Sequence, residues 1–410
     1  MKRLLYVIPR YARDLMGNRI HTEIIHCWQR AEIAVDLLTF DAGLRAPEYE
    51  LLDEIPVYRL PISATPLAKG LNRLADPLLH YPYLPGMARA YHGFLAQRQY
   101  DFVHVETAFP VGVVASWVPR HPPMAVTLPG ADVMAEHAFD YGYARFGAVR
   151  LMLRGLWARA ALLRADSRKI QRQAVALGCA PNKAVAIPYN ITDGEFPPAG
   201  VPIDQLKAAA RAQIGALHGL APTTQLVLSL SRLHPFKGVE FLVRAAPLVL
   251  RYAPDTVFLI AGPNRITAHG DYGAYLEQLA RELGVAAQVR LIGLVPHGEV
   301  RDYYAAADAV VVPSVSEALN RVAIEAAAVS TPAVVTRTTG ISEYMAEDGY
   351  GLIVEPQSGA SIAGALRVLL MNPQRQRALA ANGPRMAARF RSSVIAGELL
   401  EHYQRVLRPT

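Results

Sequence analysis

Residues 308–326 read DAVVVPSVSEALNRVAIEA, and this stretch decides the fold. It opens with a short apolar run rich in β-branched residues and continues into a Pro/Ser segment, which is typical of a buried strand that ends in a turn. Helical spacing then extends from Arg321 to Val329. Glu317 is therefore expected in the loop at the carboxyl end of a strand, and Glu325 about one turn inside the next helix.

This position of the two glutamates favours a ligand site. Open α/β sheets bind ligands in the crevice beyond the carboxyl ends of their strands. A helix N-terminus offers backbone amides to a phosphate, and a carboxylate accepts hydrogen bonds from sugar hydroxyls. Together these parts suit a nucleotide sugar, whereas the pair taken alone is equally compatible with two solvated glutamates at a helix end.

The same alternation of strand and helix extends along the whole chain and predicts a parallel α/β architecture. The expected strands are Leu4–Ile8, Val35–Phe40, Phe102–Val105, Ala125–Leu128, Ala184–Ile187, Gln225–Leu230, Thr256–Ile260, Gln288–Ile292, Ala309–Val312, Ala333–Val335 and Gly351–Val354. A Pro/Gly-containing segment near 190–205 marks a boundary. We predict domains at 1–195 and 196–385, with a last helix in 386–410 that crosses back to the first domain.

Composition limits the class of protein. The 410 residues are 52% hydrophobic and 19% charged, which is ordinary for a globular chain of two or three domains. The formal charge of +7 suits anionic small ligands or an anionic surface and is weak support for nucleic acid, so we expect no nucleic-acid partner. Two cysteines without metal-ligand spacing favour a reducing, cytoplasmic compartment. No apolar run approaches the ~20 residues of a transmembrane helix.

Common nucleotide and hydrolase motifs are absent from the sequence. No G-x-G-x-x-G follows a predicted strand, and no P-loop, H-E-x-x-H or G-x-S-x-G occurs. Dehydrogenase, NTPase, zinc-peptidase and α/β-hydrolase chemistry are therefore disfavoured.

The second half carries an ordered set of motifs. They are LSLSRLHPFKG at 228–238, Gly293, YYAAAD at 303–308, the Glu317-x7-Glu325 pair, TPAVVT at 331–336 and GISE at 340–343. In this order they resemble the GT4 family of retaining glycosyltransferases, which have the GT-B fold of two Rossmann-like domains facing a central cleft. The first half resembles the family more loosely, through residues 16–18, 129–132, 164–167 and 187–190.

The resemblance implies a role for each candidate residue. Arg232 and Lys237 are expected to bind the diphosphate, because a guanidinium and an ammonium can both pair with its oxygens. With two cations present, no metal and no cofactor are expected beyond the nucleotide-diphosphate sugar itself. Glu317 would face the sugar hydroxyls, and Glu325 would face the ribose. In the first half, Gly17 would let its loop approach the donor, and Asp132 would orient that region or the acceptor.

Backbone amides of the segment between the two glutamates complete the implied donor site. They belong to Leu319, Asn320, Arg321 and Val322. The expected catalytic residues are Glu317, Arg232, Lys237 and Asp132, although a helix cap explains Asp132 equally well.

Two departures from the family pattern leave the activity open. Pro129 stands where the family usually has histidine, and Ala318-Leu319-Asn320 replaces its common Gly-Phe-Gly. The expected function is transfer of a sugar with retention to a carbohydrate, lipid-linked or small-molecule acceptor. A GT-B-fold nucleotide-sugar epimerase and a non-catalytic nucleotide-sugar-binding subunit of a polysaccharide assembly complex are the alternatives.

A basic stretch at 145–172 interleaves arginines with leucines. It is a candidate face for peripheral contact with an anionic membrane at the inner surface of the cell. A core-packed helix whose arginines reach solvent is the favoured alternative. The basic residues are Arg145, Arg150, Arg154, Arg159, Arg164, Arg168, Lys169 and Arg172.

Overall fold

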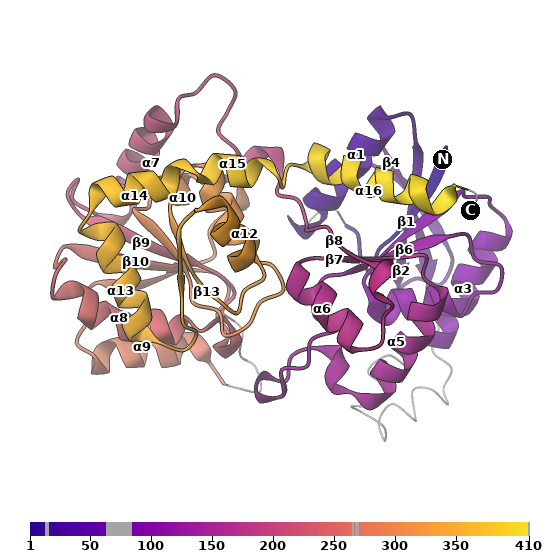
Figure 1. Ribbon diagram of the computed structural model, residues 1–410, viewed down its shortest axis with the longest axis horizontal. Coiled ribbons are helices and arrows are strands. Elements are labelled where there is room, and N and C mark those ends of the chain that lie inside the picture. The colour runs from indigo at the N-terminus through magenta and orange to yellow at the C-terminus, as the bar shows by residue number, and fades with distance from the viewer. Residues whose placement is uncertain (13–15, 63–83, 265, 267–269, 409–410) are drawn as a thin grey trace. The chain divides into compact units, whose positions relative to one another are not determined.

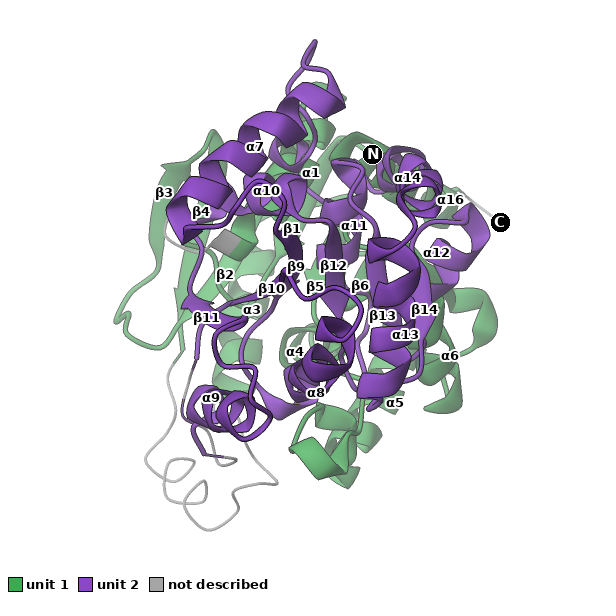
Figure 2. Cartoon of the chain, turned by 90° about the vertical axis from the view of Figure 1, so that its left-hand side faces the viewer, with its two compact units in different colours: residues 1–190, 392–410 green, residues 191–391 purple. Residues whose placement is uncertain are grey.

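The computed structural model describes residues 1–12, 16–62, 84–264, 266 and 270–408 (Figure 1). The chain divides into unit 1, residues 1–190 and 392–410, and unit 2, residues 191–391 (Figure 2). The boundaries expected after residues 195 and 385 thus lie after 190 and 391. The first and last residues of unit 2, Ile191 and Arg391, pair in a parallel bridge. The Ile191 amide also donates to the Phe390 carbonyl at 2.9 Å, so both ends of unit 2 are held together.

The sheet of unit 1 has the strand order β3-β4-β2-β1-β5-β6-β7-β8, parallel except for β3 against β4. The order reverses at β1, which pairs with β2 on one side and β5 on the other. The strands are β1 Arg3–Val7, β2 Ala34–Asp41, β3 Glu48–Leu52, β4 Ile55–Pro61, β5 Phe102–Glu106, β6 Met124–Leu128, β7 Leu162–Ala165 and β8 Ala184–Ala186.

Helices cover this sheet, and the last helix of the chain packs beside the first (Figure 1). The Trp28 indole donates to the Ala396 carbonyl at 3.0 Å and fixes that contact. The helices of unit 1 are α1 Arg19–Arg30, α3 Leu84–Ala96, α4 Val113–Ser116, α5 Gly147–Arg159, α6 Arg168–Ala176 and α16 Ser392–Leu407.

The sheet of unit 2 is parallel throughout, in the order β11-β10-β9-β12-β13-β14. Its order reverses between β9 and β12, so the crevice expected to bind a ligand lies beyond the ends of these two strands. The strands are β9 Gln225–Leu230, β10 Thr256–Ala261, β11 Val289–Gly293, β12 Ala309–Val312, β13 Ala333–Thr336 and β14 Leu352–Val354.

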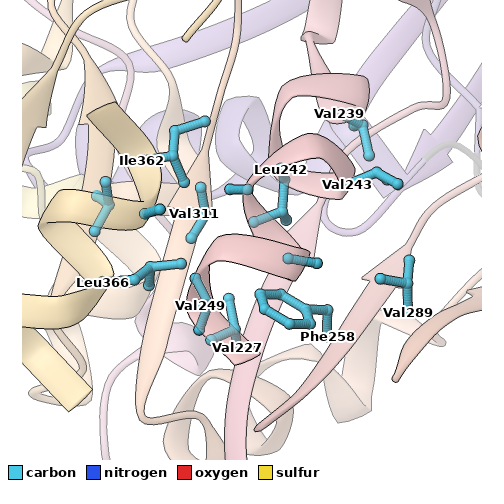
Figure 3. Packing of buried hydrophobic residues seen from close by; sticks show 14 of the residues in the cluster. Val227, Val239, Leu242, Val243, Val249, Phe258, Val289, Val311, Ile362 and Leu366 are labelled. Carbon is cyan, nitrogen blue, oxygen red and sulfur yellow. The ribbon is translucent and has the colours of Figure 1, made fainter. Parts of the chain in front are cut away.

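Two hydrophobic cores sandwich this second sheet, since successive strand residues point to opposite faces. Val227 packs with α8 and α13 on one face, as Figure 3 shows, and Leu228 packs with α7 and α10 on the other. The helices of unit 2 are α7 Ile203–His218, α8 Val239–Leu250, α9 Tyr272–Glu282, α10 His297–Ala306, α11 Arg321–Ala328, α12 Ile341–Asp348, α13 Gly359–Leu370, α14 Pro373–Ala381 and α15 Gly383–Ala388.

The parallel α/β prediction is confirmed in both units, and every expected strand is present with its ends shifted by a residue or so. Three strands of unit 1 were not predicted, namely β3, β4 and β7.

Candidate functional site

Lys237 lies at the end of a short helical turn, Pro235–Lys237, in the loop that joins β9 to α8. The next residue, Gly238, has a φ of +63°, and a Cβ there would collide with the Pro313 carbonyl oxygen. The Val315 amide donates to the Phe236 carbonyl at 3.0 Å. The loops that follow β9 and β12 are therefore joined through their backbones, and only glycine fits between them.

This joining brings Lys237 onto Glu317. The Lys237 Nζ lies 2.8 Å from Oε1 and 2.6 Å from Oε2 of Glu317, and the Ser314 hydroxyl donates to the same Oε2 at 3.0 Å. The two charged side chains are 14% and 18% exposed, so they are shielded but reachable from solvent. The β13–α12 loop holds the backbone of Glu317, because the Gly340 amide donates to the main-chain carbonyl of Glu317 at 3.3 Å.

The segment after Glu317 turns sharply into α11. Asn320 has a φ of +89°, an uncommon value for a residue other than glycine. Its side-chain oxygen accepts from the Ala323 amide at 3.1 Å and so caps the helix. Leu319 is buried, while Arg321 and Val322 are partly exposed in the first turn, where helix amides point outward. Asn320 therefore keeps the left-handed turn that glycine would otherwise supply.

Glu325 has a different partner, and Arg232 faces solvent. Glu325 accepts a hydrogen bond from the Tyr304 hydroxyl at 2.8 Å, and burial together with this carboxylate raises the pKa of Tyr304 well above its usual value. Arg232 is exposed in the loop after β9. The structure thus brings together Lys237, Glu317 and Ser314, and the serine was missed because nothing local marks its hydroxyl as a partner of the carboxylate.

Asp132 and Gly17 belong to unit 1. Asp132 follows β6, is 1% exposed, and accepts hydrogen bonds from the backbone amides of Ala108 and Phe109. Burial raises its pKa to about 7, although these backbone bonds act in the opposite direction. It therefore ties the segment after β5 to the loop after β6. Its catalytic role and the helix cap that the sequence offered as the alternative both stay predictions. Gly17 lies just before α1, with open space where a Cβ would be.

The basic stretch 145–172 spans several helices and one strand. The prediction that all of its basic residues share one surface is wrong for one arginine. Arg164 lies in β7 with its side chain 2% exposed, so it cannot belong to a basic surface. On α5 the inner face packs into the core, and the outer face carries three exposed arginines beside Leu151, which is 69% exposed. The favoured core-packed helix is present, with arginines Arg150, Arg154 and Arg159 on its solvent side.

The part of the chain that the structure describes contains neither a candidate metal site nor a candidate membrane span. No group of three or more His, Cys, Asp or Glu side chains in this part of the chain could hold a metal ion. None of the helices described is long and apolar enough to cross a membrane.

Two family models match the chain, the glycosyl transferase 4-like domain at residues 17–190 and the glycosyl transferases group 1 at residues 212–386. D-inositol 3-phosphate glycosyltransferase 1 of Catenulispora acidiphila is 29% identical over 392 residues, or 91% of this chain and 86% of that protein. The corresponding protein of Kineococcus radiotolerans is 34% identical over 245 residues, 56% of this chain and 54% of its own length. The chain spans about half the length of most of the curated relatives it matches first.

Solved structures resemble the whole chain. Sucrose-phosphate synthase of Thermosynechococcus elongatus gives a TM-score of 0.75 at 21% identity, covering 99% of both chains. HepE of Anabaena in complex with UDP gives 0.74 at 19% identity, covering 98% of this chain and 99% of that one. These likenesses confirm the predicted GT-B fold, with its two parallel-sheet units.

Proposed function

The chain belongs to the GT4 family of glycosyltransferases, and we propose that it transfers a sugar from a nucleotide-diphosphate sugar to an acceptor hydroxyl. The observation that carries this proposal is the Lys237–Glu317 pair, which lies beyond the two strands where the second sheet reverses its order. The complexes of Anabaena HepE with UDP and with UDP-glucose support a nucleotide-sugar donor.

The pair supplies the groups that transfer needs. An ammonium has three N–H donors, and two of them are directed at the oxygens of Glu317, which leaves one for a diphosphate oxygen. As the sugar leaves, negative charge grows on the diphosphate, and Lys237 with Arg232 would stabilise it without a metal. The amides of Leu319, Asn320, Arg321 and Val322 and the carboxylate of Glu325 would complete the donor site at the start of α11.

Retention of anomeric configuration is the second part of the proposal. It rests on membership of the family, whose retaining members attack from the front face while the leaving phosphate helps to deprotonate the acceptor. A proton NMR spectrum of the glycosylated product tests this, because the new glycosidic bond fixes the anomeric configuration. The anomeric coupling should match that of the donor, and an inverted coupling would contradict retention.

The acceptor is a carbohydrate, a lipid-linked sugar or a small molecule. The relatives named D-inositol 3-phosphate glycosyltransferase make inositol 3-phosphate the first acceptor to try. If the acceptor is lipid-linked, the exposed arginines of α5 and the neighbouring Leu151 are the proposed contact with an anionic membrane.

A thermal-shift screen of nucleotide sugars tests donor binding. A ligand at 100 times its dissociation constant stabilises a fold by about 2.7 kcal/mol, so the right donor should raise the melting temperature clearly. Lys237→Ala should reduce this shift, whereas Arg244→Ala, which removes an ion pair on α8, should keep it. If no nucleotide sugar shifts the wild type, the proposed donor class is wrong. Conversion of a bound donor to its epimer would instead identify an epimerase, and binding without turnover would identify a binding subunit.

A further inference from the structure

A buried carboxylate of unit 1 has no part in the donor site described above. Glu106 is the last residue of β5, beside β1, where the first sheet reverses its order. It is 1% exposed. One of its oxygens accepts from the Tyr6 hydroxyl at 2.6 Å and from His104 Nε2 at 2.8 Å, and the other accepts from the Tyr189 hydroxyl at 2.6 Å.

Glu106 stays ionised inside the protein. Burial by itself would raise its pKa, but the hydrogen bond from His104 and nearby positive charge outweigh burial and hold the pKa well below its usual range. The Arg164 guanidinium, equally buried, lies 3.7 Å away and balances the charge. A buried pair of this kind is tolerated only where its hydrogen bonds are satisfied, and Glu106 meets that condition.

The first chain segment tied to this carboxylate is the one that leaves unit 1. Arg164 donates to the carbonyls of Ile187 at 3.0 Å and of Pro188 at 2.6 Å. Tyr189, which bonds to Glu106, comes next, and the chain enters unit 2 after residue 190. Glu106 and Arg164 therefore hold the last three residues before Asn190.

The second segment is the one that returns. The chain re-enters unit 1 at residue 392, where α16 begins. Tyr403 of this helix is buried, and its hydroxyl bonds to Nδ1 of His104, whose Nε2 bonds to Glu106. Burial lowers the pKa of His104, and a neutral ring can accept from Tyr403 while it donates to Glu106.

We propose that Glu106 is a positioning residue that anchors both chain connections to unit 2, through Tyr189 and through His104 with Tyr403. Its effect on transfer rests on the proposed function. Because misplaced reacting groups slow the chemical step, a loosened anchor lowers kcat. Donor binding should stay unchanged, because the predicted donor ligands other than Gly17 lie in unit 2.

Three Tyr→Phe variants test the anchor. Tyr189→Phe and Tyr403→Phe each remove one hydrogen bond and keep the ring, and Tyr91→Phe is the matched control. Tyr91 is also a buried tyrosine of unit 1, but its hydroxyl bonds to His121 at 2.7 Å, outside this network. The measurements are amide hydrogen exchange, the dissociation constant of the donor, and kcat at saturating substrates.

A lost net hydrogen bond of about 1 kcal/mol corresponds to a change of roughly fivefold. Tyr189→Phe should speed amide exchange at Ile187, Tyr189 and Asn190 by that factor, and Tyr403→Phe should speed it in α16. In both variants kcat should fall by a similar factor, and the dissociation constant of the donor should stay unchanged. Tyr91→Phe should change neither. Wild-type exchange in both variants overturns the anchor, and faster exchange with unchanged kcat overturns its role in transfer. If the wild type binds the donor but never turns it over, both the proposed function and the role of Glu106 in transfer are wrong. The exchange data still test separately whether Glu106 anchors the two connections.

Discussion

Lys237 and Glu317 stand 80 positions apart in the chain and meet because their two loops share a backbone hydrogen bond beside Gly238. Removing Glu317 leaves the ammonium of Lys237 without its carboxylate and thus available to phosphate. Glu317→Ala should therefore bind a nucleoside diphosphate as well as the wild type, or better, while kcat falls about 10²-fold, the usual scale for one lost transition-state contact. Glu277→Ala, an exposed glutamate of α9, is the control. Collapsed nucleotide binding with normal turnover of the bound donor would remove Glu317 from the sugar site.

Arg232 and Lys237 should differ in how salt affects them. Each loss of a charged hydrogen bond costs about 1.5–3 kcal/mol, so Arg232→Ala and Lys237→Ala should each weaken donor binding about 10- to 100-fold. Arg232 is exposed and its contribution should shrink as salt is added, whereas Lys237 is shielded and its contribution should persist. Titration calorimetry at low and high salt measures both effects. Near-wild-type binding in both variants would place the diphosphate elsewhere.

Asp132 should make the fold less stable as pH rises. Its pKa is raised from 3.8 to about 7 by burial, so the folded chain keeps a proton that the unfolded chain releases. Its contribution is fully present below about pH 4 and is lost as the pH rises through 7. At ~1.4 kcal/mol per pKa unit this amounts to about 4 kcal/mol. Urea unfolding at pH 5 and pH 8 measures this. The free energy of unfolding of Asp132→Asn, relative to that of the wild type, should be higher at pH 8 than at pH 5. Equal differences at both pH values would contradict the raised pKa.

Among the elements, α5 has an outer face whose role can be tested, because that face either contacts an anionic membrane or is simply exposed to solvent. Its inner face is buried, so reversing the exposed Arg150 and Arg154 to glutamate should leave the fold intact. If the outer face binds anionic lipid, this double variant should lose vesicle binding and keep donor binding. Flotation with phosphatidylserine vesicles at low salt measures it, with Arg244→Glu and Arg281→Glu on unit 2 as a charge-matched control. Absence of wild-type binding at low salt would leave α5 as a packing helix only.

The elements that the sequence predicted are those with strong apolar runs. β7 was missed because its four residues, Leu162–Ala165, include the buried Arg164, which broke the apolar pattern. The edge strand β3 and its hairpin partner β4 are short and mix polar with apolar residues, so they gave no apolar run to recognise. The candidate site was predicted by residue type and order, but its pairings were not. Ser314 reaches Glu317 through a local turn, and Tyr304 reaches Glu325 by a contact between the helices α10 and α11. The network of Glu106 depends on contacts between elements that are far apart in the chain.

At the scale of the whole molecule, the predicted donor ligands divide unequally between the units. Lys237, Glu317 and the start of α11 belong to unit 2, whereas Asp132, Gly17 and the Glu106 anchor belong to unit 1. An active site in a cleft between the units stays a prediction. Turnover should require both units, because most of the predicted donor ligands lie in unit 2 while Gly17 and Asp132 lie in unit 1.

The most direct test of the central claim is release of nucleoside diphosphate from the donor that stabilises the protein, measured in the presence of a chelator and a panel of acceptors. The account predicts release matched one to one by glycosylated acceptor in the wild type and in Arg244→Ala, with release reduced at least tenfold in Lys237→Ala. A chelator that abolishes release would contradict the metal-free mechanism. Equal rates in Lys237→Ala and wild type would contradict the site itself.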